Sequence, residues 1–177
     1  MTWLRSAILG CCLLGLLATC SRPALGSDEE PPAPQPIKFN ALVDRLKNQW
    51  QGKVVVVDFW SDSCLPCKRD FPQLVALHRK LHEQGLICAS VNLDDPKNSR
   101  QMRAAAKFLA DQKANFDHFV LDEEPEVVPR KLGFAGPPAV FVFDRTGKLA
   151  RRFDGSDDPD GEVSYKAIEE LVVKLLK

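Results

Sequence analysis

Short apolar runs alternate along the chain with longer stretches in which apolar residues recur every three or four positions. Residues 53–60, KVVVVDFW, and residues 86–93, LICASVNL, are continuous apolar runs rich in β-branched side chains. Such runs are typical of strands that are buried on both faces and lie centrally in a sheet. Residues 118–122, HFVLD, predict a third, shorter strand, and residues 139–153 predict a hairpin that turns at residues 145–147.

Helical periodicity fills the segments between these strands. We predict helices over residues 39–50, 64–84, 96–113 and 162–176, and one or two further helical turns over residues 126–132. Strands that alternate with helices, followed by a hairpin and a last helix, predict an α/β fold. Its expected architecture is a central mixed sheet flanked by helices.

The first 26 residues have a different pattern, which is typical of a secretory signal peptide. Residues 6–19 are almost wholly apolar but number only about 14, whereas a membrane-spanning helix needs roughly 20. Two ends fit this segment. Residues 24–26, ALG, could be a cleavage site, or residues 17–20, LATC, could be a bacterial lipobox with lipidation at Cys20. Both predict export, and the second adds a lipid anchor to the membrane.

A spacer follows the signal peptide. Residues 27–36, SDEEPPAPQP, combine four prolines with three acidic residues, which is the composition of a stiff, extended linker. The remainder of the 177-residue chain is long enough for one domain with its own core. We therefore predict a signal peptide over residues 1–26, a linker over residues 27–37 and one domain over residues 38–177.

Composition excludes several kinds of partner. Lysine plus arginine equal aspartate plus glutamate at 24 each, so the chain offers no excess of basic residues for a nucleic acid. A zinc site needs four ligands, and no second cysteine or histidine pair accompanies the close cysteine pair. His78 and His82 lie four residues apart on one predicted helical face, but no third ligand is evident. We expect no metal and no separate cofactor.

Export changes how the cysteines are interpreted. The cysteines of the signal peptide are removed, or lipidated in the case of Cys20, which leaves Cys64, Cys67 and Cys88 in the domain. One close pair with one odd cysteine is not a disulfide framework. In an extracytoplasmic domain, a single close pair favours redox chemistry over stapling. Cys88 lies in a predicted buried strand and is interpreted as a small core residue.

The close pair lies in residues 58–74, DFWSDSCLPCKRDFPQL, where a strand gives way to a helix. Free backbone N–H groups and the positive end of the helix dipole stabilise an anion there and lower a cysteine pKa from about 8.5 towards 7 or below. Cys64 is therefore expected to be the exposed nucleophile. Cys67, one turn further on, is placed to attack a mixed disulfide on Cys64. Pro66 fits an early helical position, where its missing N–H costs nothing.

Asp58 stands within the apolar run that precedes the pair. A lone buried carboxylate is costly, so such a group tends to be protonated or used in function. Asp58 could then take the proton from Cys67 as that thiol attacks. The alternative is that Asp58 turns to solvent at the strand end. Further along, Pro138 precedes a predicted strand, and its X-Pro bond is either a cis peptide or an ordinary trans turn.

Taken together, these segments resemble the thioredoxin superfamily. Residues 57–72, VDFWSDSCLPCKRDFP, are similar to the thioredoxin active-site segment, and residues 133–149, GFAGPPAVFVFDRTGKL, resemble the cis-proline and hairpin segment of exported, TlpA-like members. The matching positions are Val57, Asp58, Phe59, Trp60, Cys64, Pro66, Cys67, Lys68 and Pro72 in the first segment, and Pro138, Phe141, Asp144 and Gly147 in the second.

The resemblance implies a thioredoxin fold with an extra helix and strand inserted over residues 94–122. It implies a cis bond before Pro138 and thiol–disulfide exchange by Cys64 and Cys67, with Asp58 as a proton acceptor. The expected supporting residues around the pair are Trp60, Pro66, Lys68 and Pro138.

The resemblance also implies a direction and a compartment. An exported or periplasmic protein of this subgroup is expected to reduce protein disulfides, and it then needs a membrane dithiol as electron donor. A disulfide oxidase or isomerase, and a redox-inactive binding module of the same fold, are the alternatives. A peroxidase of related fold would need a Thr-x-x-Cys loop, and the sequence contains none.

Two positions depart from the family pattern. Ser63 replaces the aromatic residue that often precedes the first cysteine, which removes an apolar rim. Pro137 occupies the position before the cis-proline, where the family pairs its backbone with a bound substrate peptide. Pro137 has no N–H to donate, so Pro137 and Pro138 are expected to form a weakened peptide clamp.

Overall fold

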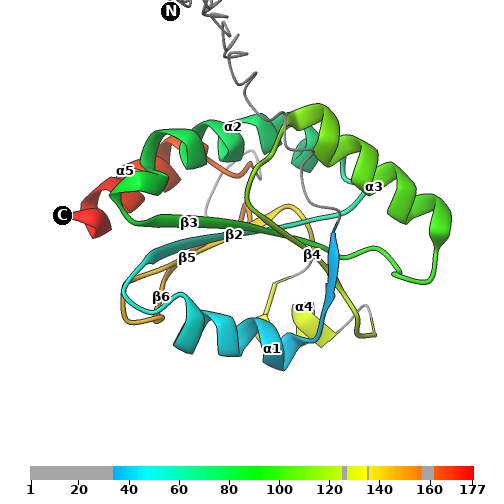
Figure 1. Ribbon diagram of the computed structural model, residues 1–177, viewed down its shortest axis with the longest axis horizontal. Coiled ribbons are helices and arrows are strands. Elements are labelled where there is room, and N and C mark those ends of the chain that lie inside the picture. The colour runs from blue at the N-terminus through cyan, green and yellow to red at the C-terminus, as the bar shows by residue number, and fades with distance from the viewer. Residues whose placement is uncertain (1–33, 125–126, 135, 157–161) are drawn as a thin grey trace, which may run out of the picture.

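The computed structural model describes residues 34–124, 127–134, 136–156 and 162–177 (Figure 1). The predicted signal peptide, Cys20 and most of the predicted linker lie outside these residues. Within the described ranges, no helix is long and apolar enough to cross a membrane.

Six strands form one mixed sheet in the order β1-β4-β3-β2-β5-β6. Strands β1, β4, β3 and β2 are parallel to one another, and β5 runs antiparallel to both of its neighbours, β2 and β6. The strand bounds are β1 Gln35–Ile37, β2 Val54–Trp60, β3 Leu86–Asn92, β4 Asp117–Leu121, β5 Ala139–Phe143 and β6 Leu149–Phe153.

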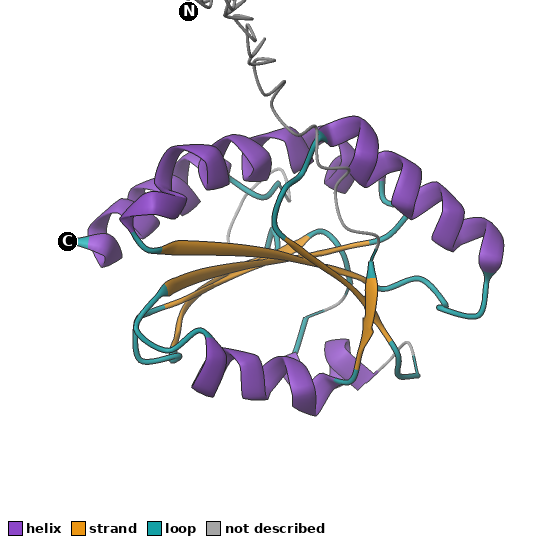
Figure 2. Cartoon of the chain, in the orientation of Figure 1, coloured by secondary structure: helices purple, strands orange, loops and turns teal. Residues whose placement is uncertain are grey.

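Helices cover both faces of this sheet (Figures 1 and 2). The helices α2, α3 and α5 lie on one face, and α1 and α4 lie on the other. Their bounds are α1 Phe39–Asp44, continued by a π-helical turn Arg45–Gln49; α2 Leu65–Leu81, continued by a 3-10 turn His82–Gln84; α3 Ser99–Gln112; α4 Val127–Leu132; and α5 Tyr165–Leu176. The predicted α/β architecture is confirmed, and α3 with β4 forms the predicted insertion.

The central position of β2 explains why its sequence is continuously apolar. Strand β2 pairs with β3 on one side and β5 on the other, and all seven of its residues are buried. Val54, Val56 and Trp60 pack in the core beneath α2 and α5. Val55 and Phe59 point to the opposite face and pack in the core beneath α1. Each face therefore needs its own apolar positions, and the usual alternation disappears.

Strand β1 corrects the predicted boundary between linker and domain. Gln35–Ile37 pairs in parallel with β4, and the Ile37 side chain is buried in the core beneath α1. The segment gave no strand signal because Pro36 lies in its middle, and proline is confined to edge strands, where its missing N–H breaks no pairing. The last three residues of the predicted linker therefore belong to the sheet.

Candidate active site

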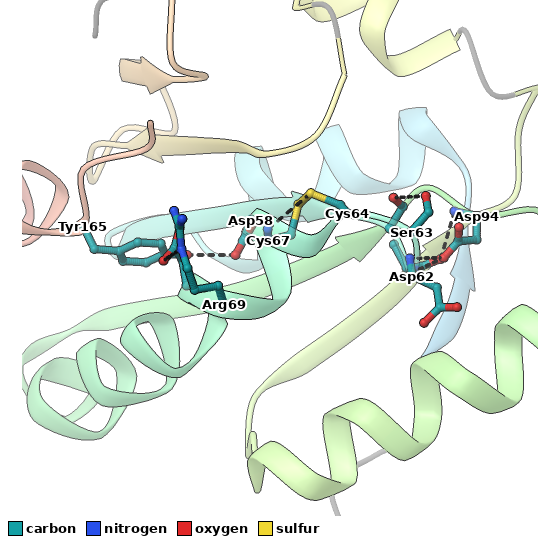
Figure 3. Close-up of a disulfide and its surroundings, with 11 residues drawn as sticks. Asp58, Asp62, Ser63, Cys64, Cys67, Arg69, Asp94 and Tyr165 are labelled. Carbon is teal, nitrogen blue, oxygen red and sulfur yellow. Dashed lines mark hydrogen bonds and ion pairs between the residues drawn. A yellow bond between two sulfur atoms is a disulfide. The ribbon is translucent and has the colours of Figure 1, made fainter. Parts of the chain in front are cut away.

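Cys64 and Cys67 are joined by a disulfide at the N-terminus of α2 (Figure 3). Cys64 is the N-cap residue of the helix, and its Sγ accepts a hydrogen bond of 3.3 Å from the Cys67 backbone N–H. The same N–H group can stabilise a Cys64 thiolate after reduction. Cys64 is 9% exposed and Cys67 is 3% exposed. Cys64 is thus the more exposed residue of the pair, although it is largely covered in the disulfide form.

Asp58 is buried, so the alternative of a solvent-facing side chain is wrong. Its Oδ2 atom accepts a hydrogen bond of 2.8 Å from the Tyr165 hydroxyl. Burial raises the pKa of Asp58 from 3.8 to about 7, against the opposing effect of the Tyr165 hydrogen bond, and the nearby charge of Asp70 adds to the rise. A carboxyl group with this pKa can both release and accept a proton near neutral pH.

The order of these groups along the site is visible in Figure 3, where Asp58 lies between Cys67 and Tyr165. The two helices that meet here are far apart in the sequence. Cys67 enters on the first turn of α2, and Tyr165 is the first residue of α5. The carboxyl group of Asp58 therefore lies on the Cys67 side of the disulfide, away from Cys64.

Tyr165 was not predicted from the sequence. Its one distinguishing mark is that it is the single tyrosine of the chain. Burial, together with the Asp58 carboxyl group, raises the pKa of the Tyr165 hydroxyl well above its ordinary value. The hydroxyl therefore stays protonated and remains a donor. Nothing in the local sequence indicates that the start of the last helix reaches a strand more than a hundred residues earlier.

Cys88 lies on the neighbouring strand and is a free, buried cysteine, as its interpretation as a core residue requires. Burial raises the pKa of the Cys88 thiol, and the nearby Asp58 adds to the rise. A thiol that is buried and held neutral is a poor nucleophile.

Asp94 fixes the loop that connects β2 to α2. Its Oδ2 accepts hydrogen bonds from the backbone N–H of Asp62 at 2.7 Å and from the Asn92 side chain at 2.8 Å. Its Oδ1 accepts from the Gln101 side chain at 3.2 Å. The carboxyl group, which is buried, thus ties the residues just before Cys64 to the end of β3 and to α3 (Figure 3).

Lys68 does not carry a free positive charge. Its ammonium group forms an ion pair with the Asp62 side chain and lies 5.6 Å from the centre of the Phe108 ring. Both partners of the ion pair are partly exposed, at 28% and 29%. The sequence analysis named Lys68 as a supporting residue but did not predict its partner in the preceding loop.

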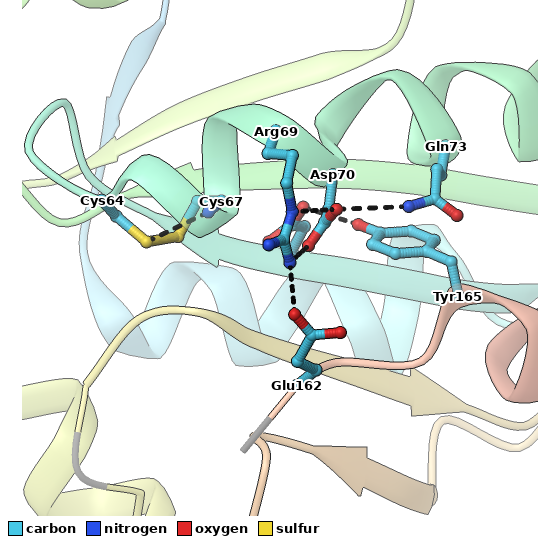
Figure 4. Close-up of polar contacts among 8 residues, drawn as sticks. Cys64, Cys67, Arg69, Asp70, Gln73, Glu162 and Tyr165 are labelled. Carbon is cyan, nitrogen blue, oxygen red and sulfur yellow. Dashed lines mark hydrogen bonds and ion pairs between the residues drawn. A yellow bond between two sulfur atoms is a disulfide. The ribbon is translucent and has the colours of Figure 1, made fainter. Parts of the chain in front are cut away.

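Charged side chains from α2 and from the segment before α5 meet near Tyr165 (Figure 4). The Arg69 guanidinium contacts both oxygens of Asp70, at 3.0 and 2.9 Å, and also Glu162 at 3.1 Å. Exposed ion pairs of this kind contribute little to stability. The Arg69 charge nevertheless offsets part of the negative charge that Asp70 presents to Asp58.

The other predicted supporting residues occupy three different environments. Trp60 is fully buried and packs against Phe71 and Phe108, with ring centres 5.8 and 5.2 Å away. Pro66 lies in the first turn of α2. The peptide bond between Pro137 and Pro138 is cis, as the resemblance implies, and both prolines are half-buried.

Leu65, between the cysteine and the proline of the motif, is the most exposed large apolar side chain among the described residues, at 76%. No signal in the sequence distinguished it from a core leucine. It presents an exposed apolar side chain directly after Cys64 in the chain.

The histidine pair lies outside this site. The rings of His78 and His82 have centres 4.9 Å apart, and the His82 Nδ1 contacts the His78 carbonyl oxygen at 3.0 Å. In the part of the chain that the structure describes, no group of three or more histidine, cysteine or acidic side chains could hold a metal ion.

The chain is similar in sequence to one protein family and to several thiol–disulfide oxidoreductases. Residues 41–152 match the profile of the AhpC/TSA family. The thiol-disulfide oxidoreductase ResA of Geobacillus thermodenitrificans is 28% identical over 107 residues, which cover 60% of this chain and 58% of ResA. The thiol:disulfide interchange protein HelX of Rhodobacter capsulatus is 29% identical over 121 residues, which cover 68% of this chain and 62% of HelX. The chain thus spans about six tenths of the length of these relatives.

One solved structure is similar in both sequence and fold. It is a Chlorobium tepidum protein assigned as a thiol:disulfide interchange protein DsbE, with 30% identity and a TM-score of 0.57. The match covers 73% of this chain and 84% of that protein.

Proposed function

The chain belongs to the thioredoxin-like AhpC/TSA family, and from this premise we propose that it is a thiol–disulfide oxidoreductase that reduces disulfide bonds in other proteins. The observation that supports this most directly is the pair Cys64 and Cys67 at the start of α2, with a buried carboxyl group beside Cys67 whose pKa is about 7. A helix N-terminus favours a thiolate, and a carboxyl group that titrates near neutral pH can accept a thiol proton.

In the proposed reaction, the Cys64 thiolate attacks a substrate disulfide. A bond forms between Cys64 and one substrate sulfur, the substrate disulfide breaks, and the leaving sulfur takes up a proton. Cys67 then gives its proton to Asp58 and attacks the Cys64 sulfur. The Cys64–Cys67 disulfide forms, the mixed disulfide breaks, and the second substrate sulfur leaves as a thiolate, which takes up a proton. Two electrons pass from the dithiol to the substrate.

The direction of electron flow is part of the proposal and has a physical argument. An oxidant of this fold has a stabilised reduced form, in which a cysteine is held as a thiolate. Here the Asp58 carboxyl group lies on the Cys67 side of the disulfide, so its ionised form places a negative charge near the resolving cysteine. Such charge disfavours a thiolate and stabilises the disulfide relative to the dithiol. The dithiol is therefore expected to give up its electrons.

The measured reduction potential tests this direction. We expect a value near the −270 mV of thioredoxin rather than the −120 mV typical of strong oxidants. Equilibration with glutathione or dithiothreitol buffers, followed by quantification of the Cys64–Cys67 disulfide, gives the value. A potential near −120 mV would contradict reduction and favour the oxidase alternative, and an intermediate value would favour isomerisation.

The proposal includes a setting. The predicted leader over residues 1–26 exports the protein, either free in the periplasm or anchored by a lipid on Cys20. Reduction of protein disulfides outside the cytoplasm consumes the dithiol, so a membrane dithiol donor is required to restore it. The proposed substrates are disulfide-bonded proteins, which is consistent with the names of the relatives as thiol:disulfide interchange proteins.

Trapping of the covalent intermediate tests the activity itself. In Cys67→Ser, the resolving sulfur is absent, so the mixed disulfide between Cys64 and a disulfide-bonded peptide should accumulate. In Cys64→Ser, the remaining Cys67 is 3% exposed and should trap little or none. Mass spectrometry of both variants, with and without dithiothreitol, measures the adduct. Absence of any adduct on Cys67→Ser would support the redox-inactive binding module instead.

A further inference from the structure

A single hydrogen bond joins the last helix of the domain to the central strand at the active site. The Tyr165 hydroxyl donates to Asp58 Oδ2 at 2.8 Å, across 107 positions of sequence, and both side chains are buried. A polar contact between two buried groups is strong because water does not compete for either partner. It also requires that both partners be held in place by their own elements.

The start of α5 is fixed by two further features. The Ser164 side chain caps the helix by accepting a hydrogen bond from the Ala167 N–H at 3.4 Å. Ile168 and Val172 lie fully buried in the core beneath α2. Tyr165 is therefore placed by a capped helix end and an apolar anchor, and its hydroxyl points at Asp58 (Figure 3).

The titratable groups that face Asp58 come from three elements. Cys67 and Asp70 belong to α2, Cys88 belongs to β3 and Tyr165 belongs to α5. Asp70 opposes ionisation of Asp58 by its charge, and the surrounding apolar side chains oppose it by burial. Among these described groups, Tyr165 is the one that favours the ionised carboxyl group, because its hydroxyl donates a hydrogen bond to the charged form.

We propose that Tyr165 is a positioning residue for the resolving step: its hydroxyl holds the Asp58 carboxylate ionised beside Cys67, ready to accept the thiol proton. This inference rests on the proposed function, because it concerns the same proton transfer. Without the hydroxyl, most Asp58 carboxyl groups would already carry a proton at neutral pH and could not take one from Cys67. Tyr165 itself touches neither sulfur in this role.

The first experiment replaces the hydroxyl by hydrogen in Tyr165→Phe. We expect the titration of Asp58, followed by the carbon-13 shift of its carboxyl group, to move to higher pH by about one unit. The rate of resolution of the Cys64 mixed disulfide should fall about fivefold at pH 7, because the ionised fraction of Asp58 falls from about a half to about a tenth. The rate should recover near pH 9.

The matched control is Ser164→Ala, which removes the cap of the same helix and leaves the tyrosine hydroxyl in place. It should lower the stability of the protein without moving the titration of Asp58. If Ser164→Ala and Tyr165→Phe moved that titration equally, the effect would come from a loosened helix and the inference would be wrong.

The single tyrosine of the chain permits a second test with the opposite sign. Biosynthetic replacement of tyrosine by 3-fluorotyrosine changes only Tyr165 and makes its hydroxyl a stronger donor. The titration of Asp58 should then move to lower pH, and the fluorine resonance should follow it. This test also serves if Tyr165→Phe folds poorly. An unchanged titration in the fluorinated protein would overturn the inference.

These outcomes separate the inference from the proposed function. The carboxyl titration is measured on the folded protein and needs no substrate. Suppose that wild type reduces a disulfide-bonded peptide and Cys67→Ser traps it, but Tyr165→Phe leaves the titration of Asp58 unchanged. The proposed function then stands and the inference fails. If no variant traps a peptide, the proposed function fails, whatever the titration shows.

Discussion

Asp58 holds a proton more tightly in the folded protein than in the unfolded chain. Its pKa rises from 3.8 to about 7, chiefly because burial removes water from the charged form. Between these values the folded state binds more protons than the unfolded state, so the stability of the protein falls as pH rises. The full cost, on the order of 4 kcal/mol, is reached above pH 7. The site thus keeps an ionisable group at the expense of stability.

Replacement of this carboxyl group should therefore stabilise the protein. Asp58→Asn keeps an oxygen that can accept the Tyr165 hydrogen bond and loses the charge. At pH 8 we expect the free energy of unfolding of the oxidised variant, measured by urea denaturation, to exceed that of wild type by a few kcal/mol. Near pH 4 the two proteins should be equally stable. Disulfide exchange should slow at the same time.

Asp144 offers a control of opposite sign. This exposed residue of the hairpin turn has a lowered pKa, chiefly because the Thr146 side chain donates a hydrogen bond to it. Its ionised form favours the folded state, so Asp144→Asn should lose stability above pH 4 where Asp58→Asn gains it. Equal slopes of stability against pH in wild type and Asp58→Asn would contradict the burial argument.

For single residues, the sequence predicted a functional role where a residue differs in polarity from its neighbours in the chain. Asp58 stands out because it interrupts a run of valines and aromatic residues, and a charge in such a place needs an explanation. Tyr165 does not stand out, because a tyrosine at the start of an amphipathic helix breaks no local rule. Its contact with Asp58 depends on how the last helix packs against the sheet, which no local pattern contains.

The conformation of the loop between β2 and α2 depends on hydrogen bonds to a residue just beyond the neighbouring strand β3. Asp94, just beyond β3, accepts the backbone N–H of Asp62 and two side-chain donors. In Asp94→Ala these buried and half-buried donors lose their partner, and we expect a loss of about 1–3 kcal/mol in the free energy of unfolding, measured by urea denaturation. Amide exchange at residues 61–64 should quicken, because the loop before Cys64 loses its anchor.

Asp95 provides the comparison for this change. Its exposed side chain accepts only a local hydrogen bond, from the Lys97 N–H at 2.9 Å. Asp95→Ala should stay within about 0.5 kcal/mol of wild type. If Asp94→Ala were equally mild and left exchange at residues 61–64 unchanged, Asp94 would not be the anchor of the loop.

The helices and strands were predicted with most success where their own periodicity is strong. Strand β2 and helix α2 follow directly from a continuous apolar run and from apolar residues at helical spacing. Strand β1 could not be predicted, since three residues with a central proline have no strand signal of their own. Its structure comes from pairing with β4, which lies some eighty residues further along.

For the molecule as a whole, the order of elements predicted the layers. Alternation of strands and helices, followed by a hairpin, indicated a mixed sheet covered on both faces, and the sheet order confirms this. The site at the start of α2 follows from the same order, since the cysteine pair comes directly after the central strand. What the sequence could not predict is which distant side chains reach that place. Asp94, Leu65 and Tyr165 were all found only from the folded chain.

Trp50 and Trp60 lie in different hydrophobic cores, on opposite faces of the sheet. Trp60 is fully buried in the core that contains both cysteines, and Trp50 is buried in the core on the opposite face. A disulfide quenches the emission of a nearby indole by accepting an electron from its excited state, and a dithiol quenches it less. The light emitted by Trp60 should therefore brighten when the pair gains electrons, while Trp50 supplies a steady background. The intrinsic fluorescence of the protein should therefore report the redox state of the cysteine pair without an added dye.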